Sequence, residues 1–252
     1  MRRQVSCEVV RLLASAAILF FDLMAVSAPC SAAEDDWGGS VALTSDYLLR
    51  GISRTSNQAA LQLDVHYSNP NGFVAGAFAS NTRIDPYNPT DAEISAFVGF
   101  VRNLAADWRA KILLSHYAYP WNQEGSNYNY DELDFDAAYR GWLHISLNYS
   151  PNSPRYVAAA PYRSLVAVTE KAAEVSVQRP IIGKLSATAG VGYSMLSGPE
   201  SGGYAYWSIG GAYDWRSLTL AASYVNTSSE AKALFYNAAA AGRFVGTMIW
   251  RF

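Results

Sequence analysis

The stretch "GRFVGTMIWRF", residues 242 to 252, has the clearest strand pattern in the chain. Every second position in it is apolar or glycine: Phe244, Gly246, Met248, Trp250 and Phe252. The positions between them include Arg243 and Arg251. Because side chains alternate between the two faces of a strand, this stretch predicts a strand with one apolar face and one charged face. The apolar face needs either a protein core or lipid against it.

The same alternation recurs from Ser40 onward in segments of about ten residues, a length that lets a tilted strand cross a bilayer. It predicts twelve strands, at residues 40 to 50, 59 to 68, 73 to 81, 92 to 102, 107 to 118, 130 to 140, 142 to 150, 163 to 178, 184 to 195, 204 to 214, 217 to 226 and 243 to 252. Apart from Pro29, the prolines fall between these segments or at their ends, which suits a residue that removes a ladder donor.

The links between the predicted strands are alternately short, as in "NPNG" and "DWRS", and long, as in "TRIDPYNPTD". Outer-membrane barrels have short periplasmic turns and longer extracellular loops. The sequence therefore predicts an all-β fold, a single transmembrane up-and-down antiparallel β-barrel with both ends of the chain in the periplasm.

Residues 1 to 33 are expected to form a cleaved signal peptide, because a basic "MRR" precedes an apolar run and the small residues Ser31 and Ala33. An N-terminal membrane anchor is the alternative, although Asp22 interrupts the apolar run. Both cysteines, Cys7 and Cys30, lie in this segment, so the barrel expected over residues 34 to 252 has no disulfide and no cysteine metal site. A chain with 19 basic and 21 acidic residues gives no case for binding nucleic acid.

The polar face of the predicted strands supplies the candidate pore lining. These side chains are Asp46, Arg50, Asp64, Glu93, Arg109, Lys111, Glu132, Asp134, Asp136, Arg140, Glu170, Glu174, Lys184 and Arg251. Opposite charges on neighbouring strands either set a field across a pore or pair and close it, and an ordinary salt-bridged wall is the alternative for each residue. The acidic excess among them favours cations.

Aromatic side chains on the apolar face gather beside the short turns, where we expect an aromatic girdle at the membrane boundary. Its members are Tyr67, Phe100, Trp108, Tyr139, Trp215, Trp250 and Phe252, and the opposite girdle would hold Tyr47, Tyr149, Tyr193 and Tyr224. A β-sandwich core is the alternative, and it explains the alternation but not the clustering at strand ends.

Other chemistry has little support in the sequence. No two histidines have metal-ligand spacing, so no metal site is predicted. His144, Ser146 and Asn148 resemble the residue types of outer-membrane phospholipases, but they alternate with apolar residues that would face lipid, which places them inside the barrel.

The segment "VALTSDYLLRGISRTSNQAALQLDVHYSNPNGFVAGAFASNT", residues 41 to 82, resembles the opening of the TorF family of proteobacterial porins. The match uses Thr44, Ser45, Asp46, Tyr47, Arg50, Gly51, Ile52, Ser53, Gln62, Tyr67, Gly72, Phe73, Ala75 and Gly76. "HYAYP", "YDELDF" and "LNYSPN" continue it in order, whereas "YRSLVAVTEKAAEVSVQRPI" departs from the aromatic-rich strand of the family. The resemblance implies an outer-membrane β-barrel porin and brings no defined substrate or catalytic residues.

We therefore expect a channel in the outer membrane of a Gram-negative bacterium, for passive diffusion of small polar or ionic solutes, without a cofactor and without enzymatic activity. A closed structural or adhesive barrel with binding loops is the alternative, and a lumen filled by salt bridges and aromatic side chains would favour it. The expected partners are membrane lipid, lipopolysaccharide and small solutes. The barrel assembly machinery is expected to bind the C-terminal strand, because a terminal Phe252 after alternating apolar residues resembles its recognition signal.

Overall fold

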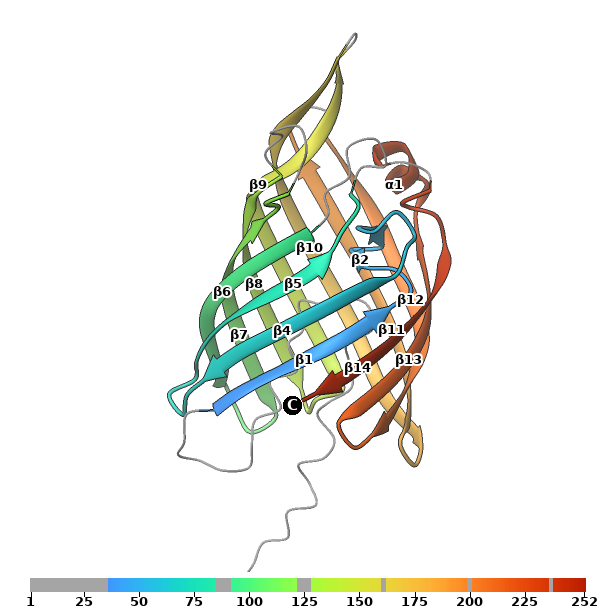
Figure 1. Ribbon diagram of the computed structural model, residues 1–252. Helices are drawn as coiled ribbons and strands as arrows, with labels where there is room; N and C mark the ends of the chain where they lie inside the picture. The colour runs from blue at the N-terminus through green and yellow to red at the C-terminus, as the bar shows by residue number, and fades with distance from the viewer. Residues whose placement is uncertain (1–35, 85–91, 122–127, 160–161, 199–200, 236–237) are drawn as a thin grey trace, which may run out of the picture.

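The protein folds as a closed β-barrel (Figure 1). The computed structural model describes residues 36–84, 92–121, 128–159, 162–198, 201–235 and 238–252, so the predicted signal peptide lies outside it. Twelve strands form the barrel: β1 (Asp36–Thr44), β4 (Ala60–Ser68), β5 (Phe73–Asn81), β6 (Ala92–Asn103), β7 (Trp108–Ala118), β8 (Tyr130–Tyr139), β9 (Leu143–Ala159), β10 (Tyr162–Ile182), β11 (Leu185–Ser197), β12 (Gly202–Trp215), β13 (Leu218–Thr227) and β14 (Arg243–Arg251). The predicted fold class is confirmed.

Each strand pairs antiparallel with its neighbours in the chain, and the last strand pairs with the first. In the closing pair, Ser40 of β1 lies opposite Arg251 of β14. Beyond it, Gly39 and Phe252 exchange two backbone hydrogen bonds of 3.1 Å each. Closure pairs every barrel strand with a neighbour on each side, so the barrel wall itself has no edge strand.

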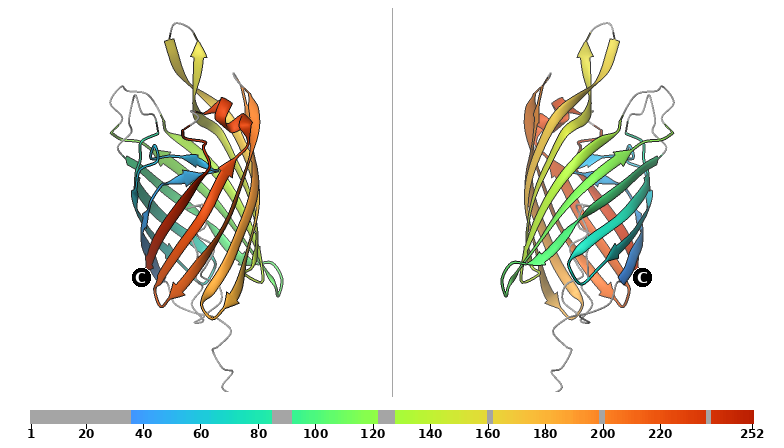
Figure 2. Two further views of the ribbon diagram at one scale, coloured as in Figure 1. Left: turned by 90° about the vertical axis from the view of Figure 1, so that its right-hand side faces the viewer. Right: turned by 90° about the vertical axis from the view of Figure 1, so that its left-hand side faces the viewer.

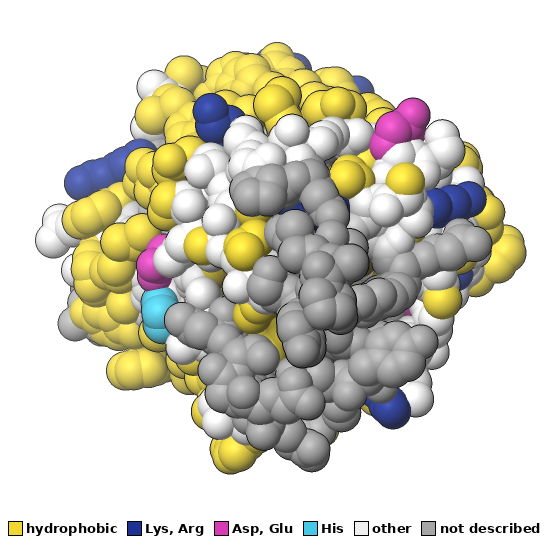
Figure 3. Space-filling view, turned by 90° about the horizontal axis from the view of Figure 1, so that it is seen from above, with side chains coloured by type: hydrophobic (Ala, Val, Ile, Leu, Met, Phe, Trp, Pro, Cys, Tyr) yellow, Lys and Arg dark blue, Asp and Glu magenta, His cyan; other side chains and the backbone are white. Residues whose placement is uncertain are grey.

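The faces of β14 follow the predicted alternation. Phe244 and Trp250 point outward with 82% and 52% of their surface exposed, whereas Val245 and Ile249 point inward and are buried. The same holds around the barrel, so the outer wall is mostly hydrophobic, as the view along the barrel from above also shows (Figure 3). This inverted arrangement, with apolar side chains outside, suits a barrel surrounded by lipid.

The connections at the two ends of the barrel differ in length, as predicted. Residues 69–72, 104–107, 140–142, 183–184 and 216–217 form tight turns at one end, which we call the short-turn end (Figure 2). The opposite end, which we call the loop end, has longer connections after β1, β5, β7 and β13, the last with a short helix, α1 (Ser229–Leu234). Two links that were predicted to be long are short there, because β9 and β10 lie only two residues apart in the chain, and β11 and β12 only four. Among the described residues, no helical segment has the length and hydropathy of a transmembrane helix.

Strands β9 and β10 continue past the loop end as a projecting hairpin, where a loop was expected after residue 150 (Figure 1). Strand β9 therefore contains Pro151 and Pro154, contrary to the prediction that prolines lie between strands or at their ends. Both come after Tyr149, the last residue of β9 that pairs with β8, so this edge of β9 needs no ladder donor there. Pro180 lies at a register shift near the end of β10.

The first predicted strand, at residues 40 to 50, is wrong in its second half. Strand β1 ends at Thr44, and residues 45–59, which we call the lumenal hairpin, fold into the barrel interior. Within it, β2 (Leu48–Leu49) pairs with β3 (Ile52–Ser53). The two residues between them, Arg50 and Gly51, have φ of 51° and 78°, as a two-residue hairpin turn of the I′ type requires.

Candidate functional site in the barrel lumen

The lumenal hairpin crosses the interior of the barrel and is fixed on its far side by Arg50. The guanidinium of Arg50 donates to Glu132 Oε2 of β8 at 2.6 Å and contacts Glu170 Oε1 of β10 at 2.9 Å. Strands β8 and β10 flank β9, which is six strands from β1 in either direction around the barrel. Because the hairpin starts at β1, these two ion pairs bridge the lumen from one wall to the opposite wall.

A second cluster joins the hairpin to β6. The carboxylate of Glu93 accepts hydrogen bonds from Tyr47 at 2.8 Å and from Arg54 at 3.4 Å. Tyr119 hydrogen-bonds both Glu93 and Arg54. Glu93 is completely buried, so its charge depends on these three partners in place of water. Tyr47 therefore lies inside the barrel, and its predicted place in an outer girdle is wrong.

Asp46 joins the base of the hairpin to β14. Its Oδ1 accepts hydrogen bonds from Ser53 at 2.6 Å and Thr55 at 2.7 Å, which fold the hairpin back on itself. Its Oδ2 accepts a charge-assisted hydrogen bond from Nη1 of Arg243 at 2.6 Å. The three clusters together connect the hairpin by buried charges to β6, β8, β10 and β14, so its position is specified from several sides of the barrel.

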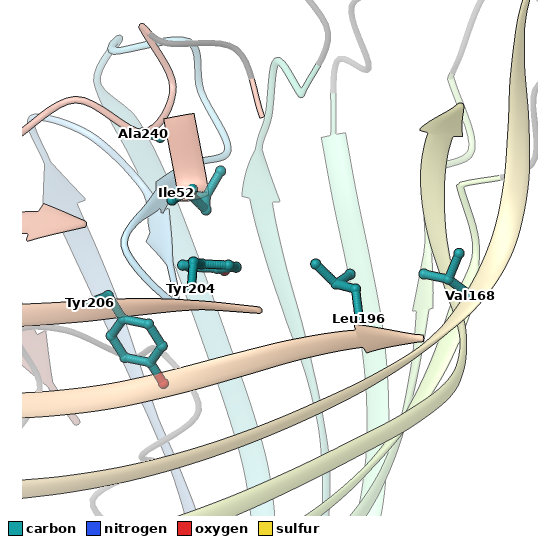
Figure 4. Close-up of a cluster of buried hydrophobic side chains, with 7 residues drawn as sticks. Ile52, Val168, Leu196, Tyr204, Tyr206 and Ala240 are labelled. Carbon is teal, nitrogen blue, oxygen red and sulfur yellow. The ribbon is translucent and has the colours of Figure 1, made fainter. Parts of the chain in front are cut away.

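Apolar contacts also hold the hairpin at the loop end (Figure 4). Ile52 packs in a buried cluster with Tyr204 and Tyr206 of β12 and with Ala231 of α1. A Cβ at Gly51 would lie 2.7 Å from Thr227 and 3.0 Å from Tyr206, so only glycine fits between the hairpin and the wall. The hairpin is thus held by packing as well as by charge.

Between the hairpin and the short-turn end, the inner wall of β4 and of β7 to β9 carries further charged and polar side chains. Lys111 pairs with Asp136 at 3.0 Å, and Asn148 donates to Asp134 at 2.6 Å. His66 contacts Asp64 at 2.8 Å. Opposite charges on neighbouring strands could either set a field across a pore or pair with each other, and Lys111 and Asp136 are paired.

The inner wall of β10 to β13 is different, because small residues dominate it at the same height. The inward side chains there include Ala172, Ser176, Thr188, Gly190, Ser208, Gly210, Ala212, Ala221 and Ser223. Phe78, Phe97 and Leu113 occupy the inner wall on the opposite side, at β5 to β7. The interior is therefore asymmetric, with bulky side chains on one side and small, partly hydroxylated ones on the other.

The sequence-predicted lumen residues divide into three groups. Asp64, Glu93, Arg109, Lys111, Glu132, Asp134, Asp136, Glu170, Glu174 and Arg251 lie on the inner face of barrel strands. Asp46 and Arg50 lie on the lumenal hairpin and not on the first strand. Arg140 and Lys184 lie in short turns outside the wall, because β8 ends at Tyr139 and β10 at Ile182.

The predicted girdle residues lie on the outer face near the short-turn end, where several form ring pairs. Trp108 and Tyr139 have ring centroids 5.1 Å apart, and those of Trp250 and Phe252 are 5.4 Å apart. Tyr67 pairs with Trp37 at 5.5 Å, a partner that the sequence reading missed because it placed the start of the first strand at Ser40. Phe100 and Trp215 are about half exposed.

His144, Ser146 and Asn148 share the inner face of β9, as predicted, but their hydrogen bonds lead away from one another. Ser146 donates to Asp136 at 2.6 Å, and His144 lies 3.3 Å from the carbonyl oxygen of Gly141. No hydrogen bond joins His144 to Ser146 in the described wall. The three side chains are therefore not arranged as a nucleophile with its base.

Arg54 and Tyr119 are central to the interior, and sequence reasoning missed both. Arg54 falls between the first two predicted strands, and Tyr119 follows the end of its strand. The available signal was Gly51, because two-residue hairpin turns of the I′ type favour glycine at their second position, and such a turn reverses the chain before Arg54.

Comparison with known families matches residues 30–252 to a bacterial protein family of unknown function, Gcw_chp. The chain belongs to this family. No match is found among curated protein sequences. The Gcw_chp match covers all the strands described above, so the barrel and its lumenal hairpin lie within the family region.

Solved structures of porins resemble this Gcw_chp barrel at low sequence identity. The KdgM porin matches with a TM-score of 0.50 and 10% identity, over 85% of this chain and 99% of that chain. The same porin in complex with disordered oligogalacturonate matches with the same values. The NanC porin matches with a TM-score of 0.54 and 8% identity, over 85% of this chain and 98% of that chain. The fold is thus that of porin-like outer-membrane barrels.

Proposed function

We propose that this protein is an outer-membrane channel through which small ions and polar solutes diffuse passively, with the lumenal hairpin as its narrowest point. The observation that carries the proposal is the polar and charged inner wall below the hairpin, enclosed by an apolar outer wall. A wall of this kind conducts without a cofactor, because movement down a gradient needs only width and lining charge. The resemblance to TorF-family porins supports the same function.

In this proposal the short-turn end faces the periplasm and the loop end faces the outside. The path for solutes runs along β10 to β13, where the inner side chains are small. Five carboxylates face the described interior below the hairpin: Asp64, Asp134, Asp136, Glu174 and Asp214. Three basic side chains face the same space: Arg109, Lys111 and Arg251. That excess favours cations over anions.

Planar-bilayer recording of the mature protein tests the proposal. We expect discrete current steps of small amplitude, because the hairpin occupies the lumen at the level of Arg50. Deleting residues 47–56 removes the paired part of the hairpin and should enlarge the steps. A folded barrel that gives no steps at any salt concentration, with or without the hairpin, would exclude a channel.

A closed structural barrel is the second candidate function. The specific observation in its favour is the interior at the loop end, which salt bridges and aromatic side chains fill: Arg50, Arg54, Glu93, Glu132, Tyr119 and Tyr204. The two candidates differ in one measurement, because a closed barrel conducts only after the hairpin is deleted. The absence of enzymatic activity is part of both, and an unchanged lipid profile in liposomes, with wild type and with Ser146→Ala, is the expected result.

A further inference from the structure

The short-turn end of β7 to β10 carries a cluster of three aromatic rings and two guanidinium groups. The rings of Trp108 and Tyr139 are 5.1 Å apart, and those of Tyr139 and Trp142 are 6.0 Å apart. The guanidinium of Arg179 lies 3.8 Å from the centre of the Trp142 ring, and that of Arg140 lies 5.3 Å from the Tyr139 ring. We call these five residues the basic-aromatic cluster.

Both guanidinium groups of the cluster belong to exposed side chains. Arg140 is 59% exposed and forms one ion pair, with Asp107 of the neighbouring turn at 3.0 Å, which raises the pKa of Arg140 above its ordinary value. Arg179 is exposed and contacts Trp142, and among the described residues it forms no ion pair. A guanidinium has five N–H donors, so each arginine can still bind an anion.

The position of the cluster specifies what kind of anion would reach it. Directly above it, toward the loop end, the outer wall is apolar and exposed at Ile112, Phe135 and Leu147. Aromatic rings mark the headgroup layer of a membrane, and acyl chains would lie against the apolar wall. An anion at this height that is joined to acyl chains is the phosphate of a phospholipid.

We propose that the basic-aromatic cluster is a binding site for the phosphate of an anionic phospholipid in the periplasmic leaflet. Arg140 and Arg179 hold the phosphate by charge-assisted hydrogen bonds, and Trp142 and Tyr139 keep the two guanidinium planes in place. The inference rests on the membrane orientation given under the proposed function but not on conduction. It therefore applies equally to an open and to a closed barrel.

The barrel contains its own control for this site. At another short turn, Arg216 lies 5.9 Å from the ring of Trp215 and is exposed in the same way. Arg216 has the same charge at the same end, but among the described residues it contacts only the ring of Trp215 and does not belong to a larger group of rings and arginines. A general attraction of positive charge to an anionic surface would involve Arg216 as much as Arg179.

Native mass spectrometry of the full barrel, taken from micelles that contain equal amounts of phosphatidylglycerol and phosphatidylcholine, tests the site. We expect preferential retention of phosphatidylglycerol by the wild type. Arg179→Gln and Arg140→Gln should each reduce this preference about fivefold, the effect of one basic residue near an anionic surface, and the double variant more. Arg216→Gln should leave it unchanged, and Arg179→Lys should keep only part of it because lysine donates as a point charge.

Three outcomes would overturn the proposal. These are equal retention of the two lipids by the wild type, an equal loss in Arg216→Gln, and complete displacement of phosphatidylglycerol by inorganic phosphate, which would show a site for the free anion. Bilayer conductance is measured on the same variants and should not change. A failure of lipid binding is thereby distinguished from a failure of the channel.

Discussion

Arg50 holds two carboxylates, Glu132 and Glu170, inside the barrel, and Glu132 is only 1% exposed. Arg50→Gln removes the positive charge and leaves both carboxylates in a poorly solvated interior. We expect a loss of about 3–5 kcal/mol in the free energy of unfolding, the usual effect of breaking a buried ion pair. Urea unfolding in lipid vesicles, followed by tryptophan fluorescence, measures it.

A second substitution separates charge from packing at this site. In Arg50→Gln with Glu132→Gln, one buried carboxylate is removed together with its partner, so part of the lost stability should return. Both variants should show larger conductance steps than the wild type, because the hairpin is released from the far wall. Unchanged steps in a folded Arg50→Gln barrel would contradict the role given to the hairpin.

Gly51 is constrained twice, by its backbone and by its neighbours. Gly51→Ala places a Cβ on a residue with φ of 78° and 2.7 Å from Thr227. The matched control is Gly183→Ala, at φ of 57° in a short turn with nothing within 4 Å. The control should lose about 1–2 kcal/mol of unfolding free energy from the left-handed backbone alone. Gly51→Ala should lose more unfolding free energy than the control. Equal losses would show that the hairpin shifts to make room for the added Cβ at little cost.

Strand β14 closes the barrel, and Phe252, the residue that follows it, acts in two ways. The backbone of Phe252 exchanges two hydrogen bonds with Gly39, and its ring covers Gly39 on the outer wall. Deleting Phe252 removes both contributions, whereas Phe252→Ala removes only the ring. We expect both variants to lower the amount of folded barrel in the membrane, and the deletion to lower it more.

Heat-modifiable migration in gel electrophoresis of isolated outer membranes quantifies folded barrel for the Phe252 variants. Phe244→Ala is the control, since Phe244 lies on the same face of β14 at the opposite end. Normal amounts of the deletion variant would contradict a role of Phe252 in assembly. An equal defect in Phe244→Ala would assign the effect to the apolar face in general.

The strands themselves could be predicted because alternation leaves a signal in every one of them. β5, for example, was predicted at the residues where it occurs, and β14 to within one residue. The lumenal hairpin gave no such signal, because its partners Glu93, Glu132 and Glu170 are far away in sequence and each resembles an ordinary wall residue. The projecting part of β9 was missed because prolines usually end strands, and only the register shows that one edge there is unpaired.

For the barrel as a whole, the excess of carboxylates below the hairpin predicts selectivity for cations. The sign of the reversal potential in a KCl gradient should show that potassium permeates more readily than chloride. Asp134→Asn with Glu174→Gln removes two inward charges and should move the reversal potential toward zero. Asp131→Asn is the control, because Asp131 lies on the other face of β8, paired with His116 outside the barrel. An equal shift in the control would attribute selectivity to surface charge.

The contact between Asp46 and Arg243 also orders events in time. The two residues are separated by 197 positions in the chain, and the hairpin additionally needs Glu132 and Glu170 on the far wall. Residues that are translated near the beginning therefore reach their final partners only after the last strand has arrived. The lumenal hairpin can therefore form all its ion pairs only in a completed barrel, and its final docking depends on closure of the barrel by β14.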